Sequence, residues 1–153
     1  GMSLNEKPIM LYSKQEQDDL NRKILVWLNT YPDKPVALID YESKLSADTP
    51  GMALSLVQNS YSPDYDILGN YDTEYQFKLI YRIKPGNSTD KRLKADEVLD
   101  AIGEWAKKQF PDIGGNRTVV SIEPVARAVM FDVFENGDED HQIMMKMTYH
   151  VEV

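Results

Sequence analysis

The sequence predicts an α+β fold, in which two principal helices pack on one face of a mixed, mainly antiparallel sheet. Apolar residues recur at helical spacing in residues 13–29 and 90–109, and they alternate at strand spacing in residues 73–84 and 141–153. The order is a helix, two or three strands, a helix and three strands. It lacks the regular alternation of a parallel doubly wound sheet, so helices and strands are expected to form separate layers.

The first helix is expected from Ser13 to Asn29. Ser13 and Glu16 have the spacing of a capping box, in which side chains satisfy free backbone N–H groups at the start of a helix. Pro32 follows the predicted end, because proline cannot continue a helix. The expected apolar face consists of Leu20, Ile24, Trp27 and Leu28.

The second helix is expected from Asp90 to Gln109. Pro111 and the pair Gly114 and Gly115 follow it and are typical of a helix terminus and a turn. Its expected apolar face consists of Ala95, Val98, Leu99, Ile102, Trp105 and Ala106.

Six segments are predicted to be strands. They are Val36–Tyr41, Met52–Gln58, Thr73–Lys84, Arg117–Glu123, Val125–Glu135 and His141–Val153. The second of them also fits the start of a helix, and the last two are expected to form a hairpin around Asn136 and Gly137. The side chains expected to be mostly buried are Trp27, Tyr75, Phe77, Leu79, Tyr81, Ile83, Leu99, Ile102 and Trp105.

The 153 residues fit a single domain, expected at residues 2–153, with Gly1 as a remnant of a removed tag. The absence of cysteine excludes disulfides and thiolate chemistry and favours a reducing compartment. No apolar run has the length of a membrane span. A net charge of -8 argues against general binding to nucleic acid.

No pattern of residues predicts catalysis or a cofactor. The sequence contains no nucleophile elbow, no glycine-rich phosphate loop and no zinc-binding helix motif. His141 and His150 are nine residues apart on one predicted strand, so their side chains are expected on opposite faces. The basic stretch Lys78–Lys94 fits either the solvated face of a strand or a local patch. The chain is therefore predicted not to be an enzyme.

Residues 135–140 hold four carboxylates and raise the alternative of a calcium loop. Counted from Asp132, the third and twelfth ligand positions are Phe134 and Ile143, which cannot bind calcium through their side chains. The interpretation is a solvated hairpin tip without a metal.

Tyrosines gather at residues 61–75, where they either cover the edge of the core or contact another subunit. The interface residues predicted from this segment are Tyr65 and Tyr71. Those predicted from the hairpin are Asp138, Glu139, Asp140 and His141.

Three motifs together resemble a known family. They are YRIKPG at residues 81–86, the helix pattern AD-x-x-L-x-x-I-G-x-W-A at residues 95–106 and ENGDEDHQI at residues 135–143. They are similar to sequences of the minor capsid proteins of tailed phages and prophages of Gram-positive bacteria. The resemblance covers about residues 20–153.

The resemblance implies a structural role at the head–tail connection of a phage particle, without catalytic residues. The order of elements is similar to that of tail terminator proteins, which form a ring on the tail tube. Expected partners are further copies of the chain and tail-tube or head-completion proteins, in the virion and, during assembly, in the host cytoplasm. The alternatives are a small intracellular adaptor or ligand-binding domain, and an enzyme without a recognisable motif.

Overall fold

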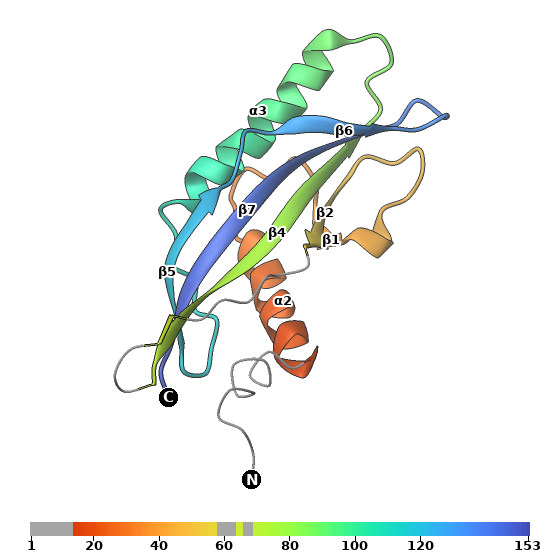
Figure 1. Cartoon of the computed structure of the whole chain (residues 1–153). Coiled ribbons are helices and arrows are strands. Elements are labelled where there is room, and N and C mark those ends of the chain that lie inside the picture. Colours follow the sequence, from red (N-terminus) through yellow and green to blue (C-terminus); the bar gives the residue numbers. More distant parts are fainter. Residues whose placement is uncertain (1–13, 58–63, 66–68) are drawn as a thin grey trace.

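The computed structural model describes residues 14–57, 64–65 and 69–153, which form one sheet with two long helices (Figure 1). The helices are α2 (Lys14–Leu28) and α3 (Thr89–Ala106), with a short 3-10 turn, η2 (Glu42–Lys44). The strands are β1 (Ile39–Tyr41), β2 (Gly51–Leu56), β3 (Asp64–Tyr65), β4 (Tyr71–Ile83), β5 (Arg117–Pro124), β6 (Val129–Val133) and β7 (Glu139–Val151). The predicted α+β class is confirmed.

The sheet is mixed and mainly antiparallel, as predicted. Its main path runs β1-β2-β4-β7-β5, while β3 pairs with β4 and β6 pairs with β7. Among the strands of the described residues, only β1 and β2 pair in parallel. The centre is the pair β4 and β7, of 13 residues each, aligned from Tyr71 opposite Val151 to Ile83 opposite Glu139. These two strands therefore position most of the molecule.

The two faces of the sheet differ because side chains alternate along each strand. On β4, Tyr75, Phe77 and Leu79 are buried toward the helices, and Met145 and Met147 of β7 lie opposite Phe77 and Tyr75. The residues between them point to the other face and are mostly polar and half-buried. This alternation is the pattern from which the strands were predicted.

Both helices pack on the same face and meet through aromatic rings. Trp27 of α2 stacks on Trp105 of α3 with ring centroids 5.2 Å apart, and its edge meets Phe77 at 6.5 Å. The side chain of Ser88 caps α3 by accepting a hydrogen bond from the backbone N–H of Lys91 at 3.2 Å. Ser13, the predicted cap of the first helix, lies outside the described residues. Neither described helix is long and apolar enough to cross a membrane.

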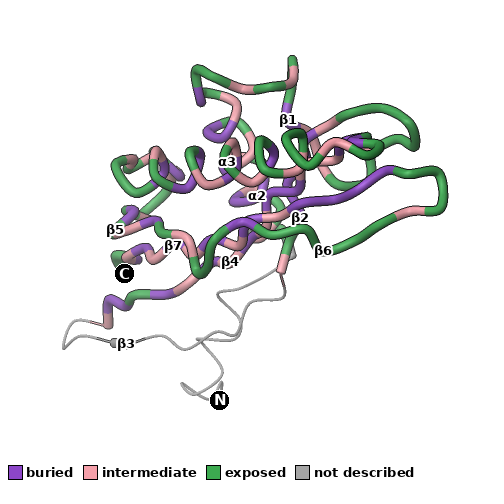
Figure 2. The backbone as a smooth tube through the Cα atoms, turned by 90° about the horizontal axis from the view of Figure 1, so that it is seen from above, coloured by how far each residue is buried: buried purple, intermediate pink, exposed green. Residues whose placement is uncertain are grey.

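The predicted core is confirmed in large part. Seven of its nine side chains are buried, and Tyr81 and Trp105 are half-buried against the core. Gly103 brings α3 close to the sheet, because a Cβ atom there would lie 2.8 Å from Pro124 and 2.9 Å from Ile143. Figure 2 colours the backbone by burial, and buried residues recur along β4 and β7.

Some predicted boundaries were wrong. The second helix was predicted to reach Gln109 but ends at Ala106, since Lys108 and Gln109 form tighter turns to carbonyls three residues earlier. The strand predicted at residues 125–135 is shorter, because the chain bends between β5 and β6, where the Ala128 N–H donates to Asp100 at 2.8 Å. The strand predicted from Val36 begins at Ile39.

Candidate assembly surface

Tyr71, which was predicted to be an exposed contact residue, is buried within the subunit. Its side chain is only 4% exposed and belongs to the hydrophobic core. The reason is that β4 begins at Tyr71, two residues before the predicted start, so the inward alternation extends to this ring. Tyr65 lies in β3, and its backbone pairs with that of Tyr71 in β4. The side chain of Tyr65 and the whole of Tyr61 lie outside the described residues.

The acidic residues of the hairpin are also not a solvated tip, contrary to the prediction. Asp138, Glu139, Asp140 and His141 are each at most 4% exposed. Only residues 135–137 remain exposed at the turn, where Gly137 adopts a positive φ of 94°. β7 begins at Glu139, and its first residue already pairs with the end of β4. The acidic residues are buried because they belong to this paired strand or directly precede it.

Arg82 neutralises Asp140 across the sheet. Its Nε and one terminal nitrogen donate to the two carboxylate oxygens at 2.7 and 2.8 Å, and its guanidinium lies 4.7 Å from the centre of the Phe134 ring. The hydrogen bond with Asp140 raises the pKa of Arg82 above its usual value. A bidentate pair of this kind fixes geometry as well as charge.

Asp138 connects the hairpin to the loop before β2. It accepts hydrogen bonds from the backbone N–H of Asp48 at 2.8 Å and from the amide of Asn136 at 3.0 Å. The Asp48 N–H is the main reason why the pKa of Asp138 lies below its usual value. Lys84 contacts both Asp138, at 3.8 Å, and Asp48. The Asp138 carboxylate therefore holds the hairpin against the loop before β2.

A third set of contacts connects the start of β7 to α3. His141 Nδ1 lies 2.7 Å from Asp96 and its Nε2 lies 3.2 Å from Glu139. Glu139 in turn accepts from Arg92 at 2.8 Å. Both ring nitrogens can donate only when the imidazole carries two protons.

The prediction that His141 and His150 lie on opposite faces agrees with the alternation along β7.

Part of the basic stretch is therefore neutralised by carboxylates of the hairpin and of the loop before β2. Arg82, Lys84 and Arg92 have carboxylate partners, and Lys78 lies 5.5 Å from the centre of the Phe131 ring. This matching of charges, rather than a free patch or a solvated tip, is what sequence reasoning missed. It depends on the pairing of β4 with β7, which joins residues 58 positions apart.

The hairpin is expected not to bind calcium. Within the described parts of the chain, no three His, Asp or Glu side chains are grouped so that they could hold a metal. Asp138 Oδ2 and both carboxylate oxygens of Asp140 already accept hydrogen bonds, so calcium bound through them would have to displace an amide, an N–H group or Arg82. Titration calorimetry should show no binding at micromolar calcium. Micromolar affinity would mean that ligands from elsewhere replace those missing at Phe134 and Ile143.

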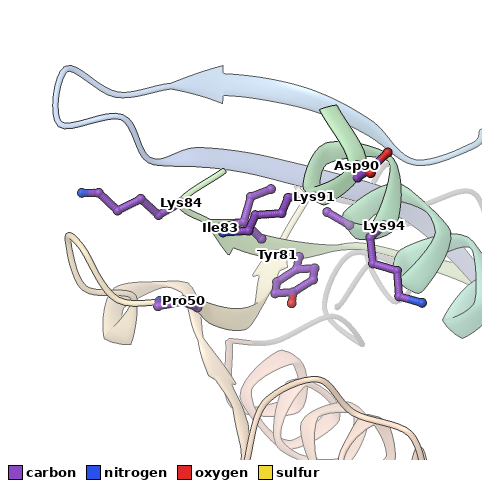
Figure 3. A pocket seen from close by; sticks show the side chains of 8 residues that line it. Pro50, Tyr81, Ile83, Lys84, Asp90, Lys91 and Lys94 are labelled. Atoms are coloured by element: carbon purple, nitrogen blue, oxygen red, sulfur yellow. The ribbon is translucent and has the colours of Figure 1, made fainter. Parts of the chain in front are cut away.

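A cavity of about 510 Å³ opens between the end of β4 and the start of α3 (Figure 3). Tyr81, Ile83 and Ala95 line it, together with Pro50 and four charged residues, Lys84, Asp90, Lys91 and Lys94. In Figure 3 the amines of Lys84 and Lys94 point away from the Tyr81 ring toward opposite sides. Ligand sites usually have polar groups that converge on the ligand. The cavity therefore gives the ligand-binding alternative little support.

The surface that stands out chemically is one edge of the sheet, which we call the β5–β6 edge. Twelve large apolar side chains are exposed among the described residues, and six of them lie on this edge. They are Val120, Val125, Val129, Met130, Phe131 and Val133. All five residues of β6 are exposed. Figure 2 shows this strand as an exposed segment, and within the described part of the chain it pairs with β7 alone.

Sequence reasoning found the strand but missed its exposure. Alternation of apolar residues predicts a strand with one buried face, whereas β6 lies at the margin of the sheet with both faces exposed. A signal was present, because Val129, Met130 and Phe131 are consecutive and cannot all face one core. A bulge between Met130 and Asp132 interrupts the regular ladder here.

Comparison with protein-family models and with curated proteins finds no match to this chain. The fold and the β5–β6 edge are therefore the basis for a proposal.

Proposed function

We propose that the chain is a structural subunit of a phage or prophage particle, which forms a ring at the head–tail connection. The observation that carries the proposal is the apolar β5–β6 edge. Several exposed apolar side chains along one edge of a small domain favour contact with another protein, because their burial removes apolar area from water. The three motifs that resemble minor capsid proteins supply the biological setting.

The size of the edge fits assembly on a template. A stable complex usually buries about 800 Å² on each partner. Six half-exposed side chains supply only part of such an area. One contact between two subunits is then weak, and a ring closes when a tail tube or a head-completion protein adds further contacts and offsets the entropy lost on association.

The charge of the chain is compatible with this position. With a net charge of -8, the subunit has no general affinity for phosphate backbones. DNA passing through a ring of such subunits is repelled rather than held. The proposed partners are thus proteins, namely copies of this chain and the proteins of the tail tube or head.

Deletion of the gene from a phage that carries it tests the proposal. We expect a loss of infectious particles, with heads and tails that are not joined when viewed by electron microscopy, because the ring between them is missing. Supplying the wild-type gene in trans is the control and should restore joined particles. Normal numbers of DNA-filled, tailed particles without the gene would contradict the proposal.

A further inference from the structure

We infer that side-chain hydrogen bonds close both margins of the sheet to the addition of a further strand. Among the described residues, β1 pairs with β2 alone and β6 pairs with β7 alone, so both are edge strands. The unpaired N–H and C=O groups of an edge strand are a template for pairing with another chain. β6 needs protection most, because four of its five residues are large, apolar and exposed.

Side chains occupy the outward N–H groups of β1. Asn29, directly after α2, pairs with Ile39 as a neighbouring strand would. Its Oδ1 accepts from the Ile39 N–H at 2.8 Å, and its Nδ2 donates to the Ile39 carbonyl oxygen at 2.9 Å. Backbone groups alternate between the two sides of a strand, so the N–H of Tyr41 lies on the same side. It donates to the Asp40 carboxylate at 2.8 Å. Since β1 has three residues, both of its outward N–H groups have acceptors.

The end of β6 is closed in the same way by Asp132. The N–H of Phe134 points toward the β7 side of the hairpin, where it donates to the carbonyl oxygen of Asp138 at 2.8 Å. The N–H of the preceding Val133 therefore lies on the open side. It donates to the carboxylate of Asp132 at 3.0 Å. An incoming strand would have to displace this carboxylate with a carbonyl group and leave the charge beside its own backbone, which costs free energy.

The rest of this margin is also unsuited to pairing. The N–H of Ala128, directly before β6, donates to Asp100 of α3 at 2.8 Å. Bulges interrupt the ladders of both β6 and β5 with β7, and a bulge turns an edge away from regular pairing. β5 ends at Pro124, which has no N–H group to donate.

The closed margin separates two kinds of contact. Pairing through the backbone is blocked, whereas the side chains of Val129, Phe131 and Val133 remain exposed. For the isolated subunit, this means that Asp132 keeps β6 from pairing with β6 of a second copy. For the assembled particle, and resting on the proposed function, it means that a neighbouring protein covers the β5–β6 edge through side chains and adds no strand to the sheet.

Three variants test the role of Asp132. Its side chain is exposed, so folding should be retained, and a thermal melt verifies it. Asp132→Ala removes the oxygen that accepts from the Val133 N–H. Asp132→Asn is the matched control, because its amide oxygen can accept the same hydrogen bond without a charge. Asp132→Ala combined with Val133→Pro removes the N–H itself, and proline is tolerated in an edge strand where the N–H faces solvent.

Sedimentation velocity of the purified subunit, at concentrations up to about 1 mM, measures self-association. We expect Asp132→Ala to associate at least about tenfold more tightly than the wild-type chain, because its Val133 N–H is free to donate to a second β6. Asp132→Asn and the proline variant should associate as weakly as the wild-type chain. Methyl NMR locates the contact, since the signal of Met130 on β6 should shift with concentration in Asp132→Ala alone.

Three results would overturn the inference. The first is that Asp132→Ala associates no more tightly than the wild-type chain. The second is that Asp132→Asn associates as tightly as Asp132→Ala, which would mean that charge repulsion and not the hydrogen bond keeps β6 unpaired. The third is that association of Asp132→Ala survives Val133→Pro. Failure here is distinct from failure of the phage role, because these measurements use the purified chain alone, whereas the role is tested by deletion of the gene.

Discussion

Replacing Arg82 with alanine is expected to lower the free energy of unfolding by about 3–5 kcal/mol, the range for removing one partner of a buried ion pair. The substitution leaves Asp140, whose side chain is 4% exposed, without its two hydrogen bonds from the guanidinium. Asp132 lies opposite Asp140 in the pairing of β6 with β7, so the uncompensated charge also meets a like charge. Chemical denaturation measures the change.

A double variant provides the control for Arg82. Arg82→Met combined with Asp140→Leu removes both charges and retains apolar volume, so it should be far less destabilising than the single change. A loss for Arg82→Ala below about 1 kcal/mol, the range of surface pairs, would show that the pair is effectively solvated.

Tyr71→Ala is expected to destabilise the isolated subunit by about 3–5 kcal/mol, as truncation of a buried aromatic side chain does. The ring is 4% exposed and lies in the core cluster at the start of β4. Thermal and chemical denaturation of the purified subunit measure the effect.

Val129→Ala is the matched control for Tyr71→Ala. It removes apolar atoms from a side chain that is 49% exposed and should change stability by less than about 0.5 kcal/mol. If Tyr71→Ala left stability unchanged and reduced only the yield of infectious particles, Tyr71 would be a subunit contact after all, and its burial would not matter for folding.

The sequence predicted the regular elements because their periods are local. Residues alternate from Tyr75 to Ile83 in a way that predicts a strand with one buried face, and the helical spacing of Leu99 and Ile102 predicts a helix with one buried face. In the structure these faces are buried. The burial of Tyr71 was not predicted, because alternation indicates the ends of a strand only weakly. The predicted strand began two residues too late and therefore left out one inward-facing residue.

The candidate surfaces were less predictable for a physical reason. Whether Asp140 is solvated depends on Arg82, 58 residues away, and periodicity carries no information about which strands pair. Likewise, the exposure of Val129 and Phe131 follows from the place of β6 at the sheet margin. The charge-rich hairpin is the most conspicuous feature of the sequence. In the fold, however, apolar side chains remain exposed on the neighbouring β5–β6 edge.

We propose that this chain forms part of the joint between a phage head and its tail. The most direct test is an electron microscopy reconstruction of that joint, from deletion particles restored with the wild-type gene. The account predicts a ring of subunits with this fold, in which the β5–β6 edge of each copy is covered by a neighbouring protein. A joint without density for this chain, in particles from which the chain is also absent by mass spectrometry, would contradict the account.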